Sequence, residues 1–252
     1  MLDKSLNKVA VVILAAGHGK RMQSVDRPKV MHSLGGKPLI GYLSDTVQSL
    51  GFGIKPVVVV GINKEVVIDY LGDGFDYVEQ AEQLGTGHAV ARAESILRGN
   101  AEDVLVLYGD MPFIKTESIR QLIDEHVEKN NTLTLMTATV PDFSGWYAQF
   151  YSFGRIIRAP SGQIVNIVER KDACEEELRI TELSTCRFCF KAEWLWENLK
   201  NLQNNNAQGE YYLTDLVRFA FKQEEKFSAI PLTPKEAIGV NTQDDLKIAA
   251  TL

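Results

Sequence analysis

The stretch that decides the fold is Val9-Ala-Val-Val-Ile-Leu-Ala-Ala-Gly-His-Gly-Lys-Arg-Met22, in which an apolar run leads directly into a glycine-rich loop. The residues from Val9 to Leu14 are all apolar and mostly β-branched, which predicts a strand buried on both faces, as in a parallel sheet. Gly17 and Gly19 let the backbone turn tightly after that strand and bring N–H groups close to a phosphate or a base. The stretch therefore predicts a ligand site at the end of a strand in an α/β protein.

The spacing of this loop differs from that of two better known glycine loops. A P-loop has four residues between its first glycine and a Gly-Lys-Ser/Thr triplet, whereas one residue separates Gly17 from Gly19, and Arg21 follows Lys20. A dinucleotide fingerprint needs a third glycine at the position of Met22. A P-loop is therefore excluded. A nicotinamide oxidoreductase stays open as an alternative function, but Met22 in place of the third glycine weakens it.

Composition and charge limit the classes of protein further. The chain has 252 residues, 45% of them hydrophobic, and 27 Lys and Arg against 33 Asp and Glu give a net charge of -6. The apolar content argues against disorder, and the length fits one large α/β domain, expected to span residues 1–252. Net acidity disfavours a nucleic-acid partner, so a phosphate ligand requires a local positive cluster. That cluster lies between residues 20 and 37 and consists of Lys20, Arg21, Arg27, Lys29 and Lys37.

The sequence contains neither a candidate membrane span nor a secretory signal. No apolar run approaches the roughly 20 residues that a membrane-spanning helix requires. The first eight residues are polar in character, unlike a signal peptide. We therefore predict a cytoplasmic protein with no membrane partner, and the oligomeric state is left open.

Short β-branched runs alternate with helical patterns through the first half of the chain, as in parallel strands joined by crossover helices. The second half continues the same sheet without a linker or an internal repeat. Strands are expected over residues 9–14, 56–60, 76–79, 104–107, 133–140, 155–158, 164–169, 184–190 and 227–231. Helices are expected over residues 38–50, 64–71, 88–97, 116–129, 192–202 and 213–222, with a last helix introduced by Thr242.

The three cysteines are too few, and odd in number, for a disulfide framework. Cys186 and Cys189 form a C-x-x-C, but they fall on the expected strand 184–190, where residues three apart point to opposite faces. We therefore expect buried or half-buried strand cysteines and not a redox or zinc pair.

Further motifs follow the glycine loop in a fixed order. They are Arg27-Pro-Lys29, Gln80-Ala-Glu-Gln-Leu-Gly-Thr-Gly-His-Ala89, Tyr108-Gly-Asp110, Gly154-Arg-Ile156, Ile167-Val-Glu169, Asn204 to Asp215 and Gly239-Val-Asn241. With these motifs in this order, the chain resembles the sugar-1-phosphate nucleotidyltransferases, and in particular the uridyltransferase half of bacterial bifunctional enzymes. The chain shows no hexapeptide ladder of the left-handed β-helix type, which is typical of the acetyltransferase half of those enzymes.

The resemblance implies a Rossmann-like three-layer fold with a mixed, mainly parallel sheet. It also implies a reaction in which UTP and a sugar 1-phosphate, N-acetylglucosamine 1-phosphate foremost, give a UDP-sugar and pyrophosphate, with Mg²⁺ as cofactor. A phosphomonoester with a second pKa of about 6 is already ionised at neutral pH, so the site has to position two anions and neutralise their charge without a general base. Glucose 1-phosphate or another sugar 1-phosphate, and a non-catalytic nucleotide-sugar-binding protein, stay open as alternatives.

Residue by residue, the resemblance assigns the catalytic, metal and nucleotide positions. The catalytic cations are Arg21 and Lys29, and the metal ligands are Asp110 and Asn241. Asp110 also follows a buried strand, where open α/β sheets place ligands, and oxygen ligands of this kind suit Mg²⁺. The nucleotide-binding residues are Leu14, Ala15, Ala16, Gly17, Gln80, Gly85, Thr86, Tyr108 and Gly109.

Three residues of the segment from Gln80 to Ala89 have individual expectations. The carboxamide of Gln80 can donate and accept hydrogen bonds, which suits the imide edge of uracil. Thr86 can bind the nucleotide, cap the following helix, or do both. His88 matches the family motif but is expected to be structural.

The sugar-binding residues implied by the resemblance are Gly154, Glu169 and Ser184. A carboxylate such as that of Glu169 is a natural acceptor for sugar hydroxyls. The chain departs from the family at Glu182-Leu-Ser-Thr-Cys186, where the family has Glu-x-Asn-Thr-Gly, so Ser184 replaces a sugar-contacting asparagine and Cys186 replaces a glycine. The segment 143–153 is longer and more aromatic than the family loop, and it either stacks on the sugar or covers the sheet. These departures leave the identity of the sugar open.

Overall fold

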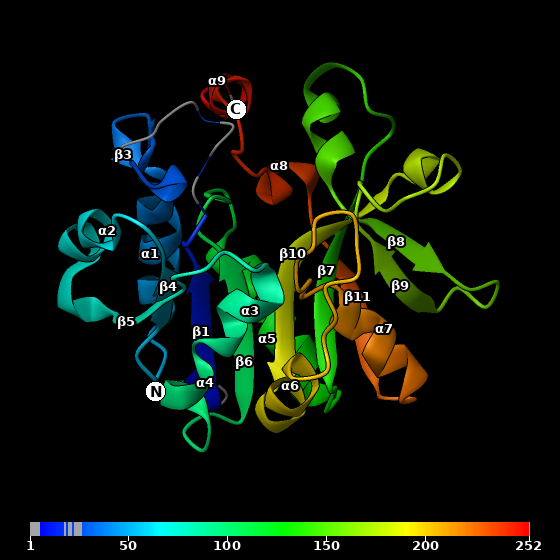
Figure 1. Cartoon of the computed structure of the whole chain (residues 1–252), viewed down its shortest axis with the longest axis horizontal. Coiled ribbons are helices and arrows are strands. Elements are labelled where there is room, and N and C mark those ends of the chain that lie inside the picture. Colours follow the sequence, from blue (N-terminus) through cyan, green and yellow to red (C-terminus); the bar gives the residue numbers. More distant parts are fainter. Residues whose placement is uncertain (1–5, 18, 20–21, 23–26, 252) are drawn as a thin grey trace.

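The computed structural model describes residues 6–17, 19, 22 and 27–251. These residues form three layers, in which helices cover both faces of one mixed sheet of nine described strands (Figure 1). A path of seven strands runs in the order β11-β7-β10-β6-β1-β4-β5, and β8 and β9 extend from β10. The strands are β1 (Val9–Leu14), β4 (Val57–Val60), β5 (Asp76–Glu79), β6 (Asp103–Tyr108), β7 (Leu133–Thr139), β8 (Arg155–Arg158), β9 (Ile164–Val168), β10 (Glu182–Lys191) and β11 (Phe227–Pro231).

The strand directions confirm the expected mixed, mainly parallel sheet. β1 pairs in parallel with β4 and β6, β4 with β5, and β11 with β7. β10 pairs antiparallel with both of its neighbours on the path, β6 and β7. One reversed strand thus joins two parallel groups into a single sheet.

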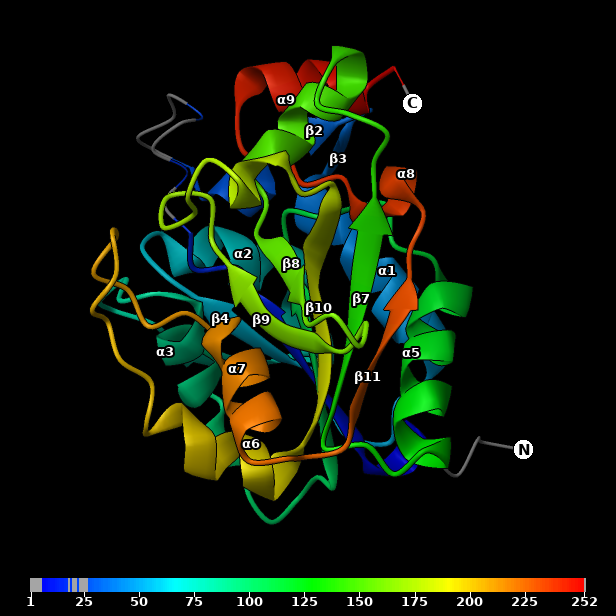
Figure 2. The ribbon, with the colours of Figure 1, turned by 90° about the vertical axis from the view of Figure 1, so that its right-hand side faces the viewer.

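The side chains of β1 are buried on both faces because they alternate between two hydrophobic cores. Val9, Val11 and Ile13 belong to the core that contains α1 (Leu39–Leu50) and α5 (Thr116–Glu128). Ala10 and Val12 belong to the opposite core, whose helices are α3 (Thr86–Ala91), α4 (Glu94–Leu97), α6 (Ala192–Leu199) and α7 (Asp215–Lys222). Figure 2 shows these helix layers on opposite sides of the sheet.

Most of the predicted elements are confirmed, and the differences concern short segments. The expected helix 88–97 is two helices, because Arg92 and Ala93 donate to carbonyls three residues back instead of four. The helices expected over 192–202 and 213–222 are the shorter α6 and α7. The expected α2 (Lys64–Leu71) and α9 (Gln243–Ala249) are present. No helix in the described part of the chain is long and apolar enough to cross a membrane.

Several elements are too short for a periodic pattern to predict them. They are α8 (Pro234–Ala237), the 3-10 helix η5 (Gly145–Ser152), and the two-stranded sheet of β2 (Ser33–Leu34) and β3 (Lys37–Pro38). Of these, η5 contributes Ser152 to the candidate site, and α8 precedes the segment that carries Asn241.

The strand that carries the C-x-x-C is irregular. Its register on β7 shifts between Ser184 and Phe188, and Cys186 has a φ of 57°. The expected strict alternation from Cys186 to Cys189 is therefore wrong, because a bulge interrupts it. The expected burial is confirmed, since Cys189 is buried, Cys186 is half-buried, and both thiols are free.

A buried polar network lies at the start of β6, at the end of the sheet opposite to the loop that follows β1. Asp103 accepts hydrogen bonds from Lys191 Nζ (2.9 Å) and His126 Nε2 (3.2 Å), and His126 Nδ1 contacts Thr134 Oγ1 (3.0 Å). Burial by itself raises the pKa of Asp103, but the hydrogen bonds from His126 and Lys191 bring it below its ordinary value. The ionised carboxylate therefore stabilises the folded state.

We expect Asp103→Asn to lower the free energy of unfolding at pH 7 by about 3 kcal/mol, as when one partner of a buried ion pair is removed. Because the pKa of Asp103 is lower in the folded state, its contribution is complete above the unfolded pKa and is lost as the pH falls through the folded pKa. Thermal unfolding between pH 7 and pH 3 should therefore show the two Tm values converging below about pH 4. The exposed pair Lys55–Asp76 provides the control, since Asp76→Asn should change Tm little at any pH. A constant difference in Tm across the whole range would contradict the expectation.

Candidate active site

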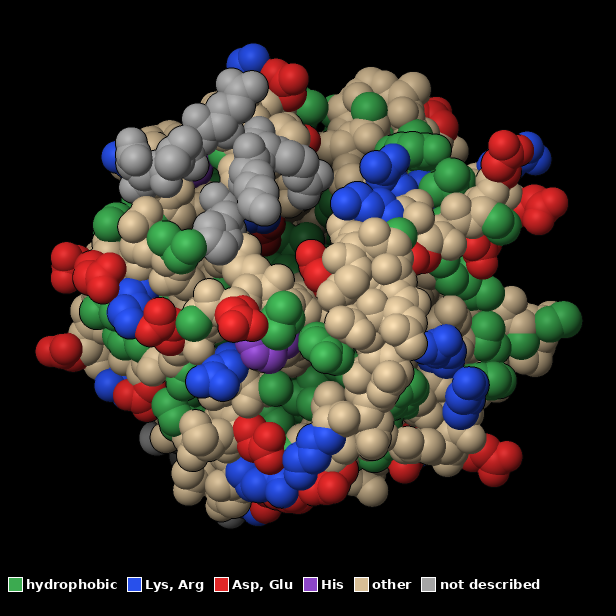
Figure 3. All heavy atoms as spheres, in the orientation of Figure 1, with side chains coloured by type: hydrophobic (Ala, Val, Ile, Leu, Met, Phe, Trp, Pro, Cys, Tyr) green, Lys and Arg blue, Asp and Glu red, His purple; other side chains and the backbone are tan. Residues whose placement is uncertain are grey.

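Two cavities open at the carboxyl ends of β1 and β6, where open α/β sheets place ligands. The first cavity has a volume of about 230 Å³ and the second a volume of about 430 Å³. Lys29, Tyr108 and Asp110 line both, so the cavities meet at these three residues. Figure 3 shows this face of the molecule hollowed at its centre.

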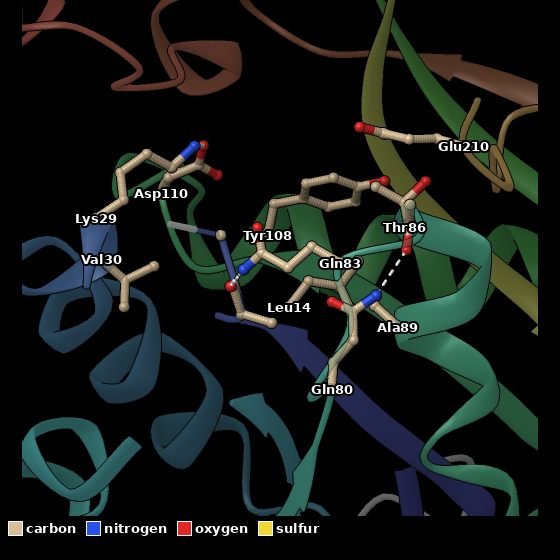
Figure 4. Close-up of a pocket in the computed structure, with 13 residues that line it drawn as sticks. Leu14, Lys29, Val30, Gln80, Gln83, Thr86, Ala89, Tyr108, Asp110 and Glu210 are labelled. Carbon is tan, nitrogen blue, oxygen red and sulfur yellow. Dashed lines mark hydrogen bonds and ion pairs between the residues drawn. The ribbon is translucent and has the colours of Figure 1, made fainter. Parts of the chain in front are cut away.

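Most of the residues expected from the sequence gather around these cavities. The first cavity (Figure 4) is lined by Leu14, Ala16, Gly17, Lys29, Val30, Gln80, Gln83, Gly85, Thr86, Ala89, Tyr108, Asp110 and Glu210. The second cavity is lined by Lys29, Tyr108, Asp110, Met111, Ser152, Phe153, Gly154, Glu169, Arg170, Lys171, Cys186, Gln208 and Asn241. Of the expected set, Ala15, Gly109 and Ser184 line neither cavity, and Arg21 lies outside the described residues.

The register of β1 on β6 aligns the two loops that form the centre of the site. Leu14 is the partner of Tyr108, and the N–H of Gly109 donates to the carbonyl of Leu14 (2.9 Å). A Cβ at position 109 would lie 3.1 Å from that carbonyl oxygen, so only glycine permits this approach without displacement. The N–H of Ala15 donates to Val59 O (2.8 Å) on the other side. Ala15 and Gly109 therefore hold the backbone in place behind the cavities.

Three polar groups from distant parts of the chain meet where the cavities join. The ammonium of Lys29 donates to the carboxylate of Asp110 and to Asn241 Oδ1 (3.0 Å), and Figure 4 shows Lys29 and Asp110 directed toward one another. Asp110 is 7% exposed, and its carbonyl accepts from the N–H of Val240 (2.9 Å). The segment that ends in Asn241 is thereby fixed against the end of β6.

Asp110 and Asn241 have the donor chemistry of a magnesium site. Both provide oxygen ligands, and their oxygens already converge on one cation, the ammonium of Lys29. The described residues contain no group of three or more His, Cys, Asp or Glu that could hold a metal ion by themselves. Mg²⁺ is commonly held by one or two protein oxygens together with substrate phosphates and water. The pair therefore fits Mg²⁺ brought in with a phosphorylated ligand.

The side chain of Gln80 is fixed with its amide oxygen available to a ligand. Gln80 is 4% exposed, and its Nε2 donates to Gly85 O (3.0 Å) and to His88 Nδ1 (3.0 Å). Burial, followed by the charge of Arg92, lowers the pKa of His88, so its Nδ1 is free to accept. No described residue donates to Gln80 Oε1, which Figure 4 shows turned toward Leu14. His88 thus orients Gln80, in keeping with its expected structural role.

Thr86 is the first residue of α3 and does not cap that helix with its side chain. Its hydroxyl oxygen instead accepts from the N–H of Leu213 (3.0 Å), which joins the wall of the first cavity to the segment before α7. Of the roles left open for Thr86, capping of the helix is therefore wrong, because the helix begins at Thr86 itself and not after it.

Gln83, which the sequence did not single out, spans the first cavity. Its Nε2 donates to the carbonyl of Ala16 in the glycine-rich loop, and Figure 4 shows the side chain extended between the two walls. Gln83 lies within the matched motif from Gln80 to Ala89, so position in the motif was the available signal. Only the tertiary structure shows that it bridges to Ala16.

Of the residues expected to bind the sugar, Gly154 and Glu169 line the second cavity, and Cys186 lines it in place of Ser184. Glu169 Oε1 accepts from Thr214 Oγ1 (2.9 Å), and burial raises the pKa of the Glu169 carboxyl. A Cβ at Gly154 would lie 2.9 Å from Ile167 Cγ2, so glycine keeps the space beside Glu169 clear. Ser184 is fully buried and donates its N–H to Gly154 O (2.9 Å), whereas Cys186 lines the cavity. The bulge in β10 thus gives Cys186 the place at the cavity that the sequence assigned to Ser184.

The aromatic segment 143–153 forms η5 and packs over the end of the sheet. Phe150 is fully buried, and the guanidinium of Arg155 lies 5.1 Å from the ring centre of Phe143 and 4.9 Å from that of Tyr151. Only Ser152 and Phe153 of this segment line the second cavity. Of the two interpretations left open by the sequence, the structure favours the covering role.

Comparison with known proteins agrees with this arrangement. Residues 11–171 match the family described as the MobA-like NTP transferase domain. The chain is 42% identical over 240 residues to the bifunctional protein GlmU of Clostridium botulinum (strain ATCC 19397 / Type A). This alignment covers 94% of this chain and 50% of that protein. The chain is 43% identical over 242 residues to the bifunctional protein GlmU of Streptococcus pyogenes serotype M3 (strain ATCC BAA-595 / MGAS315). This alignment covers 96% of this chain and 51% of that protein. The chain thus spans about half the length of the curated relatives it matches.

The fold also has a close counterpart among solved structures. UDP-glucose pyrophosphorylase complexed with UDP-glucose superimposes with a TM-score of 0.77 at 19% sequence identity, over 96% of this chain and 97% of that chain. This likeness confirms the Rossmann-like nucleotidyltransferase fold. The match over residues 11–171 shows that the chain belongs to the family of MobA-like NTP transferase domains, as its nucleotidyltransferase motifs predict.

Proposed function

We propose that the chain is a uridylyltransferase that joins UTP to a sugar 1-phosphate, N-acetylglucosamine 1-phosphate foremost, and releases pyrophosphate. The observation that carries this proposal is the meeting of two cavities at Lys29 and Asp110, where two phosphorylated ligands can share one charged junction. The identity with the GlmU proteins supports it over the half of their length that matches. The fold shared with UDP-glucose pyrophosphorylase is consistent with it.

The reaction requires positioning and charge neutralisation more than acid–base chemistry. The phosphate oxygen of the sugar 1-phosphate attacks the α-phosphorus of UTP, a new P–O bond forms, and the bond to the leaving pyrophosphate breaks. That phosphate is already ionised at neutral pH, so it needs no general base. Lys29 would neutralise phosphate charge at the junction, together with Arg21 of the same basic loop. Asp110 and Asn241 would hold Mg²⁺, which when bound supplies further neutralisation of the phosphates.

The fixed orientation of Gln80 gives a reason for a preference for uracil. Its free Oε1 is an acceptor, and the imide nitrogen of uracil carries a hydrogen that it can donate. The corresponding ring nitrogen of cytosine carries no hydrogen and would leave this buried acceptor unpaired, which disfavours CTP.

The sugar side supports two candidate substrates. Glu169 offers a carboxylate to sugar hydroxyls, which suits any hexose 1-phosphate. Cys186 places a side chain at the cavity where the family has glycine, and this loss of space favours a smaller sugar. Glucose 1-phosphate is therefore the second candidate.

The proposal includes a cytoplasmic location and the absence of nucleic-acid and membrane partners. All three cysteines are free thiols, one of them exposed, which is typical of a reducing compartment.

The direct test measures pyrophosphate release from each of the four nucleoside triphosphates against a panel of sugar 1-phosphates with Mg²⁺. We expect the highest kcat/KM with UTP and N-acetylglucosamine 1-phosphate, and no turnover after chelation of the metal. Absence of turnover with every pair would refute the enzyme assignment, and a preference for CTP would refute the role of Gln80.

Asp110→Asn should lower kcat by at least about 100-fold, because it removes a charge that faces the reacting phosphates and their metal. Asp244→Asn is a matched control, since Asp244 forms an exposed ion pair with Lys247 away from the cavities and its change should leave kcat unaltered. Thermal unfolding establishes that both variants fold. Near-normal kcat in folded Asp110→Asn would remove Asp110 from the site.

Cys186→Gly should change the choice of sugar without reducing stability. Glycine adopts a φ of 57° without strain, and removal of the thiol enlarges the second cavity. We expect the kcat/KM ratio of N-acetylglucosamine 1-phosphate to glucose 1-phosphate to rise by about 10-fold, as for a change of one small group in a pocket. Cys174→Gly, at an exposed cysteine, is the control. An unchanged ratio would show that Cys186 does not face the part of the sugar that differs.

A further inference from the structure

The bulge in β10 presents two neighbouring side chains to different parts of the site. Ser184 pairs with Thr137 and Phe188 pairs with Leu135, so the three residues from Thr185 to Arg187 stand opposite Met136 alone. Cys186, in the middle of the bulge, lines the second cavity. Arg187 is the last of these three residues, and its side chain reaches the segment beyond the amino-terminal end of the strand.

Arg187 is buried without a carboxylate partner among the described residues, yet its guanidinium is hydrogen-bonded. It is 1% exposed, and it donates from Nη1 to Thr185 O (2.7 Å) and from Nη2 to Glu236 O (2.6 Å). Burial lowers the pKa of Arg187 to about 10, so the group is still charged at neutral pH. A buried cation is costly unless its hydrogen bonds are made. The two carbonyls are therefore held firmly, and one of them belongs to α8.

The segment reached by Arg187 is the one that delivers Asn241. Glu236 lies in α8, and its own carboxylate accepts from Ser118 Oγ (2.6 Å) and from the N–H of Lys115 (3.1 Å). Four residues further on, the N–H of Val240 donates to Asp110 O (2.9 Å), and Asn241 follows. Figure 1 shows α8 beyond the amino-terminal end of β10, between the sheet and α9. Arg187 thus anchors one end of the short stretch whose other end lies on Asp110.

We propose that Arg187 is a positioning residue that ties α8 to β10 and thereby sets Asn241 beside Asp110. Its role in turnover rests on the proposed function, whereas its role in placing the segment does not. The buried Arg155 is the natural comparison, because it also donates only to carbonyls, those of Tyr151, Phe153 and Leu178, and these lie on the side of η5 and not of α8.

The first readout is independent of activity and uses the whole chain without metal. Hydrogen exchange of the Val240 amide should be about 10-fold faster in Arg187→Met than in the wild type, since the bond to Asp110 O opens more often when α8 is released. Arg187→Lys should lie between them, because an ammonium keeps a donor and the charge. Arg155→Lys should leave the Val240 amide within about twofold of the wild type.

The second readout is the Mg²⁺ concentration that gives half-maximal turnover. We expect a rise of about 10-fold in Arg187→Met and none in Arg155→Lys, because only the former disturbs the pair of metal-facing oxygens. Should Arg187→Met fail to fold, Arg187→Lys carries the test, with faster exchange at Val240 expected at an unchanged global Tm. Unchanged Val240 exchange in a folded Arg187 variant, or equal acceleration by Arg155→Lys, would overturn the proposal. Absence of turnover with every substrate would refute the proposed function, and the exchange measurement would still decide the role of Arg187.

Discussion

The in-register pairing of β1 with β6 is the constraint on which the rest of the site depends. Because the two strands are parallel and Leu14 is opposite Tyr108, the loops that follow them emerge at one level of the sheet. The close approach of Gly109 to Leu14 holds these loops together. A shift of one residue would turn the side chains of β6 to the opposite face and separate Asp110 from Lys29.

Charge is organised around the same junction. A chain with a net charge of -6 repels phosphates at a distance. Binding of phosphates at the junction therefore depends on the cations close to it and not on the net charge of the chain. Lys29 stands between the carboxylate of Asp110 and the amide oxygen of Asn241, which makes the junction a place where cations and phosphates can both be held. The proposed transfer between two anions requires this combination, and the two cavities extend from it in different directions.

The bulge in β10 lies next to both the second cavity and the segment that carries Asn241. Within the bulge, Cys186 lines the second cavity and Arg187 donates to the carbonyl of Glu236. In a regular strand, neighbouring residues would point to opposite faces of the sheet, and both faces are buried here. Of the two positions where the chain departs from the family motif, Ser184 directly precedes this irregularity and Cys186 lies within it, so the departure is a local change of backbone as well as of side chain.

The sequence by itself determined where the strands and most helices lie along the chain, because apolar runs and helical periodicity are local properties. It also indicated the residues around the first cavity, since they lie in continuous motifs such as Tyr108-Gly-Asp110. Only the tertiary structure decided that Lys29, Asp110 and Asn241 meet, that Cys186 takes the place expected for Ser184, and that Gln83 and Arg187 bridge separate segments. These are contacts between residues far apart in the chain or at a break in strand periodicity, and the packing of the sheet fixes them, whereas local sequence preference does not.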